Sequence, residues 1–358
     1  MKISRSTKCS LRFANKGKLR SLDTVLTEYG RVVSLFIDQF WGNCPSKGKL
    51  LKPIVDSVGT WFSARLRKVA AREAIDMVKA ARAKDDEKAT KPVHRGTRMC
   101  VSSTIASLSS AKNATEFDCW LHLSSIGNKV ILSLPIKRHE HFNDLASRGR
   151  RLESYVITRE YVQFTFEIET GPKKPMDRCV GIDTGINALC SLSTGRQLGT
   201  DIKLRIDRVK RCKHGSRGQR RAVRALRQRM NEVAKQVTSK ATLVVIENLK
   251  GITKNTKRRL VKSMRRSIGR WNVRYWLSRL QMTCEDTNVS FRTVSPWRTS
   301  QTCPACGYAD RRNRVDQKFL CRKCGHADNA DVNAAKNILY RFLSGPYGAG
   351  CKPCSVCV

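Results

Sequence analysis

Four cysteines in the C-terminal third of the chain have the spacing of a metal site. Cys303-Pro-Ala-Cys306 and Cys321-Arg-Lys-Cys324 are two Cys-x2-Cys turns, each followed by a glycine, with fourteen residues between them. Each turn offers two thiolates, and two such turns complete the tetrahedral four-thiolate shell of a structural zinc site. We therefore predict one Zn²⁺ bound by these four residues. Cys351, Cys354 and Cys357 form a second, incomplete set, which we interpret as part of a loose tail.

Three carboxylates stand at the ends of predicted elements. Asp183 and Glu247 each end a short apolar run, and Asp331 opens a predicted helix after the second cysteine pair. Taken alone, each has an ordinary structural interpretation: a turn residue, a surface charge at a strand end, and a helix N-cap. Together they could converge at one edge of a sheet and hold two Mg²⁺ ions about 3.5–4 Å apart, which is an arrangement that hydrolyses phosphodiesters. Asp328 competes with Asp331 for the third position.

The charge balance predicts a polyanionic partner. The 358 residues include 70 Lys+Arg and 29 Asp+Glu, a formal net charge of +41, and 40% of them are hydrophobic, which suffices for packed cores. Nucleic acid is the first candidate partner and an anionic membrane the second. The chain has no apolar run of about 18 residues and no apolar N-terminal segment, so we expect no membrane partner. Fifteen mostly scattered cysteines without a signal peptide indicate a reducing compartment, and we expect a cytoplasmic, nucleoid-associated protein.

Two strongly basic runs, 203–229 and 254–266, lie on either side of Glu247. The ordinary interpretation of a charge run is a solvated helix face. Two runs of the same sign beside one candidate catalytic acid favour contact with a phosphate backbone instead. The residues that we assign to nucleic-acid contact are Arg208, Lys210, Arg211, Lys257, Arg258 and Arg259.

The N-terminal half must form two kinds of structure. Apolar residues from Leu22 to Phe40 recur every three or four positions, and a second helical pattern follows Pro53, so we predict a helical module over 21–92. Period-two runs within 93–170 predict antiparallel strands, which with a strand in 1–20 would make a small β-barrel. Residues 102–115 are interpreted as a loop or an edge strand, and 171–178 as a linker.

The C-terminal half alternates strands and helices, which is typical of an α/β domain. We predict strands at 179–183 and 243–246, a basic helical stretch between them, and a helix with Val273 and Leu280 on its apolar side. The predicted α/β domain comprises 179–296 and 325–342, with the zinc ribbon at 297–324 and a tail at 343–358.

Four sequence blocks in this half occur in a recognisable order. They are Gly181-Ile-Asp-Thr-Gly185, Ile246-Glu-Asn-Leu-Lys-Gly251, Ser295-Pro-Trp-Arg-Thr-Ser-Gln-Thr-Cys303-Pro-Ala-Cys-Gly307 and Asp331-Val-Asn-Ala-Ala-Lys-Asn-Ile338. The series resembles the transposon-encoded TnpB proteins, relatives of the type V CRISPR effector nucleases. The resemblance implies an RNase H-like (RuvC) nuclease domain with an inserted zinc ribbon. For 1–178 it implies a wedge-like β-barrel with a helical recognition insertion, although the stretch between Asp183 and Glu247 is short for the family.

The resemblance also implies a function. Carried over by position, Asp183, Glu247 and Asp331 form a metal-binding triad for Mg²⁺, and the partners are a guide RNA and a target double-stranded DNA. The implied activity is RNA-guided cleavage of DNA next to a short target-adjacent motif, by a monomer or a homodimer. Three alternatives remain open: an RNA-guided repressor of the same fold that does not cut, a type V CRISPR effector, and a guide-independent zinc-ribbon protein of the translation or transcription machinery.

Overall fold

The computed structural model describes residues 2–83, 89–111, 115–249 and 272–345. They form two compact units, one of Lys2–Glu169 and one that begins at Thr170. Among these residues, no helix combines the length and the apolarity that crossing a membrane requires.

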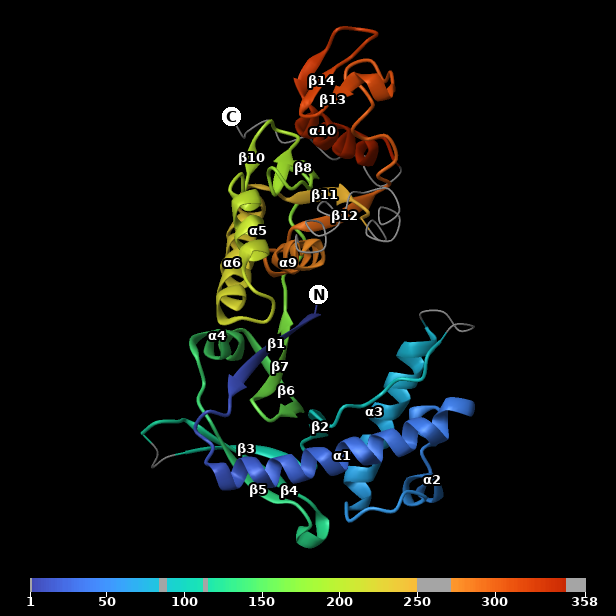
Figure 1. The fold of residues 1–358 in the computed structure, drawn as a ribbon, viewed down its shortest axis with the longest axis vertical. Helices are drawn as coiled ribbons and strands as arrows, with labels where there is room; N and C mark the ends of the chain where they lie inside the picture. Colours follow the sequence, from blue (N-terminus) through green and yellow to red (C-terminus); the bar gives the residue numbers. More distant parts are fainter. Residues whose placement is uncertain (1, 84–88, 112–114, 250–271, 346–358) are drawn as a thin grey trace. The chain divides into compact units, whose positions relative to one another are not determined.

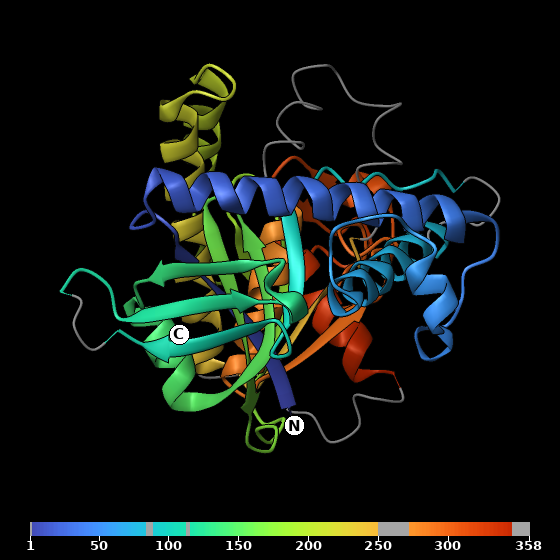
Figure 2. The same cartoon turned by 90° about the horizontal axis from the view of Figure 1, so that it is seen from below.

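The helical part of unit 2–169 has three helices. They are α1 (Lys16–Gly42), α2 (Lys52–Asp56) and α3 (Ala64–Arg82). The side chains of Asn15 and Ser63 cap α1 and α3 by accepting backbone amide hydrogen bonds. The apolar stripe predicted from Leu22 to Phe40 is buried along α1, which packs against α3 and also contacts strands of the same unit (Figure 2). Hydrophobic periodicity therefore predicted the main helix correctly.

The strands of unit 2–169 form two antiparallel sheets. The first has the order β1 (Lys2–Ser10), β7 (Tyr161–Glu169), β6 (Gly149–Thr158), β2 (Arg98–Ser102), and the second has the order β3 (Ala106–Ser110), β4 (Cys119–Ser124), β5 (Ile131–Ile136). The predicted alternation is confirmed, and β3 is an edge strand, as expected for 102–115. Helix α4 (Glu140–Arg148) and β6 were not predicted. No strand pairing in the described residues joins the two sheets, so barrel closure stays a prediction.

The unit that begins at Thr170 is built on a mixed five-stranded sheet. Its order is β10 (Gln197–Leu198), β9 (Cys190–Leu192), β8 (Cys179–Asp183), β11 (Leu243–Glu247), β12 (Ser290–Val294). Strands β8, β11 and β12 run parallel, whereas β9 and β10 are antiparallel to their neighbours. The predicted α/β architecture of this half is therefore confirmed.

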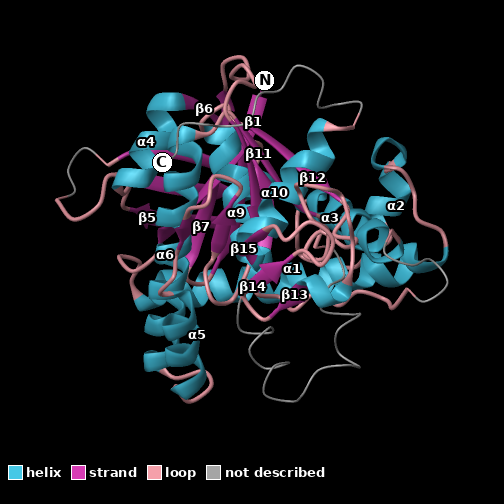
Figure 3. Cartoon of the chain, turned by 90° about the horizontal axis from the view of Figure 1, so that it is seen from above, coloured by secondary structure: helices cyan, strands magenta, loops and turns pink. Residues whose placement is uncertain are grey.

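Helices cover both faces of this sheet. On one face, α5 (Ile202–Arg211), α6 (Arg217–Lys240) and α9 (Val273–Asp286) share a core with Ile182, Val244 and Ile246. On the other, α10 (Ala330–Leu343) packs on Leu243 and Val245. The predicted single basic helical stretch is wrong in detail, because α5 and α6 are two helices that pack side by side (Figure 3). The turn between them includes Gly215 with φ of 75°.

Gly181 sets the distance between β8 and α10. A Cβ atom at this position would overlap the carbonyl oxygen of Ala335 and lie 2.8 Å from Leu339 Cβ. Any larger residue would push the helix away from the strand, so only glycine permits this approach.

A small three-stranded sheet precedes α10. It comprises β13 (Arg314–Val315), β14 (Lys318–Leu320) and β15 (Ala327–Asn329), which are antiparallel neighbours in that order. Strand β15 leads without a gap into α10, and both β14 and β15 contact that helix. Figure 1 shows β13 and β14 next to α10. The sheet of the ribbon therefore runs past the predicted boundary at 324.

Candidate active site and metal centre

The register of β8 and β11 brings two of the predicted acids side by side. Ile182 lies opposite Ile246 in this parallel pair, so Asp183 and Glu247 occupy the next position on each strand. Adjacent strands are about 4.8 Å apart. Since Ile182 and Ile246 face α5, α6 and α9, the alternation of side chains directs Asp183 and Glu247 to the opposite face, which α10 covers.

Asp331 reaches the same face from the first turn of α10. The N-cap of this helix is Asn329, whose side-chain oxygen accepts hydrogen bonds from the amides of Asp331 (3.0 Å) and Val332 (3.2 Å). The N-cap interpretation of Asp331 is therefore wrong. Its carboxylate pairs instead with Arg314 of the ribbon, with 2.8 Å between Oδ1 and Nη2.

The electrostatics of the three acids connect them. Burial, followed by the charges of Glu247 and Asp331, raises the pKa of Asp183 to about 7, against the opposing charge of Arg314. Burial also raises the pKa of Glu247, although the hydroxyl of Thr299 donates to its Oε1 and offsets part of this rise. Negative charge thus accumulates in a poorly solvated place, which is common at functional sites.

Asp328, the competing third acid, lies in a different setting. Its carboxylate pairs with Lys336 Nζ at 2.7 Å, and it is not among the charges that act on Asp183. Of the two candidates, Asp331 is therefore the one that shares the electrostatic environment of Asp183.

Two asparagines of α10 hold the loop that leads from β12 to the ribbon. The buried Asn337 donates from Nδ2 to the carbonyl oxygens of Thr299 (2.8 Å) and Thr302 (2.6 Å), and Asn333 donates to Thr302 (3.0 Å). Because Thr299 binds Glu247, these bonds fix the position of a partner of the site. Sequence reasoning did not single out Asn333 and Asn337, although two amides four residues apart on an apolar helix face were a usable signal.

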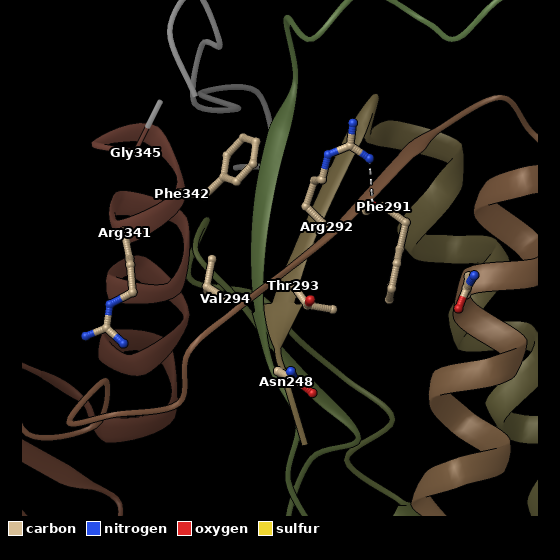
Figure 4. A pocket seen from close by; sticks show the side chains of 9 residues that line it. Asn248, Phe291, Arg292, Thr293, Val294, Arg341, Phe342 and Gly345 are labelled. Carbon is tan, nitrogen blue, oxygen red and sulfur yellow. Dashed lines mark hydrogen bonds between the residues drawn. The ribbon is translucent and has the colours of Figure 1, made fainter. Parts of the chain in front are cut away.

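Arg341 fastens the same loop from the other end of α10. Its guanidinium donates to the carbonyl oxygens of Ser295 (2.5 Å) and Trp297 (2.8 Å). Beside it a cavity of about 720 Å³ opens along the edge strand β12, between Asn248 and Phe342 (Figure 4). None of the three acids lines this cavity, so we assign it no part in their chemistry.

The four predicted zinc ligands converge in the ribbon. Their sulfur atoms all lie within 4.8 Å of one another, with 3.7 Å between Cys303 and Cys324 and 3.6 Å between Cys306 and Cys321. Tetrahedral Zn–S bonds of about 2.3 Å would separate the sulfurs by about 3.8 Å. The cluster therefore has the donor type, number and spacing of a structural zinc site.

The three acids suit magnesium by donor type. Carboxylate oxygens are the ligands that Mg²⁺ prefers, and the raised pKa of Asp183 indicates a concentration of negative charge that a divalent cation would relieve. In the described part of the chain, however, only the cysteine cluster brings the ligand atoms of three or more His, Cys, Asp or Glu side chains within 4.8 Å of one another. Asp331 is engaged by Arg314. The predicted pair of Mg²⁺ ions therefore stays a prediction.

The residues predicted to contact nucleic acid divide into two groups. Arg208 and Arg211 are exposed near the end of α5, whereas Lys210 is half-buried and pairs with Asp207 at 2.7 Å. The others fall outside the described residues, as do the three cysteines of the tail: Lys257, Arg258, Arg259, Cys351, Cys354 and Cys357.

Comparison with known sequences supports the predicted resemblance. Residues 275–338 match a family model described as the TNB domain of Cas12f1-like proteins. The chain is 32% identical over 127 residues to a TnpB-like protein of Aquifex aeolicus, covering 34% of this chain and 41% of that protein. It is 29% identical over 213 residues to the putative RNA-guided DNA endonuclease InsQ of Escherichia coli, covering 50% of this chain and 52% of that one. The chain thus spans about half the length, or less, of these curated relatives, and its resemblance to TnpB proteins is confirmed.

Comparison with solved structures extends over most of the chain. The cryo-EM structure of a Cas12f1–sgRNA–target DNA complex superposes with a TM-score of 0.53 at 15% identity, over 89% of this chain and 81% of that one. At this identity the likeness concerns the fold. It confirms the α/β fold that the sequence predicted.

Proposed function

We propose that this protein is a transposon-associated, RNA-guided DNA endonuclease that cleaves double-stranded DNA next to a short target-adjacent motif. The proposal rests chiefly on one observation: Asp183, Glu247 and Asp331 share one face and one electrostatic environment at an end of the central sheet. They do so in a chain whose net charge of +41 suits a polyanionic substrate. The names of the relatives, which describe TnpB-like proteins and RNA-guided endonucleases, support the same activity.

Each residue of the site then has a role. Asp183, Glu247 and Asp331 hold the metal, and Thr299 orients Glu247 through its hydroxyl hydrogen bond. Arg314 brings a fixed positive charge beside Asp331, where it can stabilise the charge on a reacting phosphate. Bound Mg²⁺ would supply an acidified water and neutralise the leaving oxygen.

The N-terminal unit completes the proposal. We assign 21–92, which contains α2, α3 and α1 except its first turn, as a recognition module inserted into a wedge made of 1–20 and 93–170. In RNA-guided nucleases base pairing reads the target, while the protein grips duplex shape and a short adjacent motif. This unit would hold the guide–target duplex while the other unit cuts.

The test compares two aspartates, one inside the proposed triad and one outside it. The protein is purified with its native RNA, the RNA is sequenced, and a matching double-stranded DNA is added with Mg²⁺. Asp183→Asn should lower the cleavage rate by about 10²–10³-fold or more while DNA binding is kept, because it removes a metal-binding carboxylate. Asp328→Asn is the matched control and should cut at nearly the wild-type rate, since the Asp328 carboxylate contacts Lys336 and the Asn329 amide and does not act on Asp183.

Two outcomes would contradict parts of the proposal. Equal cleavage by Asp183→Asn and the wild type would remove the triad assignment, and target binding without any cleavage by the wild type would favour the repressor. The RNA sequence separates the remaining alternatives: a guide from a transposon end supports the proposal, and a CRISPR-repeat guide indicates a type V effector.

A further inference from the structure

A groove lined by arginines runs between α6 and α9, apart from the acids. It has a volume of about 680 Å³, and its walls include Arg220, Arg224 and Arg227 of α6 and Tyr275 of α9. All three arginines are exposed, and their spacing of four and three residues puts them on one side of the helix. We call the groove that these four residues line the arginine groove.

Contacts within the arginine groove hold its wall in place. The hydroxyl of Tyr275 donates to Asn231 Oδ1 at 2.9 Å, and the guanidinium of Arg227 lies 4.8 Å from the centre of the Tyr275 ring. The face of the Tyr275 ring thus packs against the Arg227 guanidinium, and its hydroxyl hydrogen-bonds to α6. This arrangement orients positive charge towards the groove and does not present the ring alone as a base-stacking platform.

The part of the chain that the structure describes does not balance the charge of the arginine groove. The acids of α6, of α5 and of the α5 N-cap are engaged elsewhere: Asp201 pairs with Arg205 and Arg229, Asp207 with Lys210, and Glu232 with Arg229. Within the described residues, neither Arg220 nor Arg224 takes part in an ion pair, and no acid lines the groove. The segments 250–271 and 346–358 contain no Asp or Glu at all. The described residues therefore leave this site open to an anion from outside the chain.

The dimensions and donor types of the arginine groove select the kind of anion. Arg220 and Arg227 are separated by about 10 Å along the helix axis, at 1.5 Å per residue. This distance suits a row of negative charges better than a single small anion. Guanidinium groups bind phosphate oxygens through two parallel hydrogen bonds, which is why arginine prevails where phosphates are recognised.

We propose that the arginine groove binds the sugar-phosphate backbone of a nucleic-acid strand, with Arg220 and Arg224 each contacting a phosphate. The proposal rests on the proposed function for the identity of the polyanion, and it adds a binding site that neither the acids nor the ribbon provides. Because the contacts are to phosphates, the groove adds affinity without sequence preference. The strand is either the guide RNA or the target DNA, which share this chemistry.

The experiment measures how binding depends on salt. Binding of the full chain to a labelled mixed-sequence single-stranded RNA, and of its RNA-loaded Asp183→Asn form to matching DNA, is followed by anisotropy at several KCl concentrations. Each phosphate contact contributes about 0.7–0.9 to the slope of log Kd against log salt. The double variant Arg220→Gln/Arg224→Gln should therefore reduce that slope by about 1.4–1.8 on one of the two ligands.

The matched control removes the same charge from the same helix. Arg217 and Arg221 are exposed residues of α6 that do not line the groove, and Arg217→Gln/Arg221→Gln should change the slope by less than half as much. A loss confined to RNA assigns the groove to the guide, and a loss confined to DNA assigns it to the target. Equal slope changes in the two double variants would overturn the proposal.

A second variant separates charge from geometry and guards against misfolding. Arg220→Lys/Arg224→Lys keeps both charges, so it should keep the wild-type slope while Kd rises several-fold, because lysine cannot form the two parallel bonds. Since all binding is measured without cleavage, an inactive triad does not affect the result. Wild-type protein that bound neither ligand would contradict the proposed function itself, whereas wild-type binding with a normal slope in the glutamine variant would contradict only the groove.

Discussion

Glu73 and Asp183 are carboxylates in poorly solvated surroundings, one in each unit, and their neighbours differ in kind. Glu73 is 7% exposed and accepts a hydrogen bond from the Tyr29 hydroxyl at 2.8 Å. Arg98 Nη2 lies 3.1 Å from its Oε1, and His94 Nε2 lies 3.6 Å away, beyond hydrogen-bond length. Burial raises the pKa of Glu73, but these neighbours outweigh it and lower the pKa to about 2.

Asp183 has the opposite balance. Its largest influences are burial and two further acids, and together they raise its pKa to about 7. The chain thus offsets the negative charge of Glu73 with the Tyr29 hydroxyl and the charge of Arg98, whereas at Asp183 it adds like charge. A carboxylate whose partners come from the fold stabilises that fold, and one that lacks them indicates a ligand.

The largest effect is expected at the four-cysteine cluster, where the concentrated negative charge is that of thiolates and the ligand is zinc. Cys303→Ser should remove most of the bound zinc per chain and unfold the ribbon, because structural zinc contributes on the order of 10 kcal/mol to folding. Metal analysis and limited proteolysis of the ribbon measure both effects. Cys212→Ser, at a half-buried cysteine outside the cluster, should leave the zinc content unchanged. Full zinc content in Cys303→Ser would contradict the assignment.

The same amide substitution should act oppositely on the two carboxylates. Glu73→Gln should lower the free energy of unfolding by about 2 kcal/mol, because it removes the charge that pairs with Arg98 and that strengthens the hydrogen bond from the Tyr29 hydroxyl. Asp183→Asn should leave it unchanged or raise it in metal-free buffer, because a repelled charge is removed. Denaturant unfolding of the full chain gives both values. Equal losses in the two variants would show that the contrast between these carboxylates has no energetic weight.

The third effect concerns pH. The folded pKa of Glu73 is about 2 and the ordinary value is 4.5, so its contribution to stability is complete above about pH 4.5 and is lost as the pH falls towards 2. Between pH 6 and pH 3 the wild type should lose about 2 kcal/mol more than Glu73→Gln does. The difference between the two pH profiles isolates Glu73 from other acids. Parallel profiles would mean that the pKa of Glu73 is not lowered in the folded protein.

Sequence reasoning reached the parts of the site that local patterns encode. Asp183 and Glu247 end apolar runs, and strand alternation with a parallel register suffices to put them together. The spacing of Asn333 and Asn337 could have marked these amides, but their partners and the role of Thr299 could not be predicted, because the hydrogen bonds join segments that only the packing of α10 brings close. That packing depends in turn on Gly181. The sequence block Gly181–Gly185 contains no pattern that indicates a contact with a helix.

The arginine groove also could not be predicted from local sequence patterns. The basic run 203–229 is evident from the composition alone. From this run, the sequence predicts nucleic-acid contact for Arg208, Lys210 and Arg211. Whether a charge is already paired depends on which acids the fold brings near, and the fold pairs Lys210 but leaves Arg220 and Arg224 facing a groove. Charge density is a property of sequence, whereas unbalanced charge is a property of structure.

The gapless joint between β15 and α10 limits how the chain can change length. One residue inserted between Asn329 and Asp331 would turn the carboxylate by about 100° around the helix axis, since a turn takes 3.6 residues. It would also separate Asp331 from the cap and from Arg314. An insertion elsewhere in the ribbon should be accepted only where it keeps two features: the contiguous residues from Asn329 to Asp331, and the strand pairing that holds Arg314 beside Asp331.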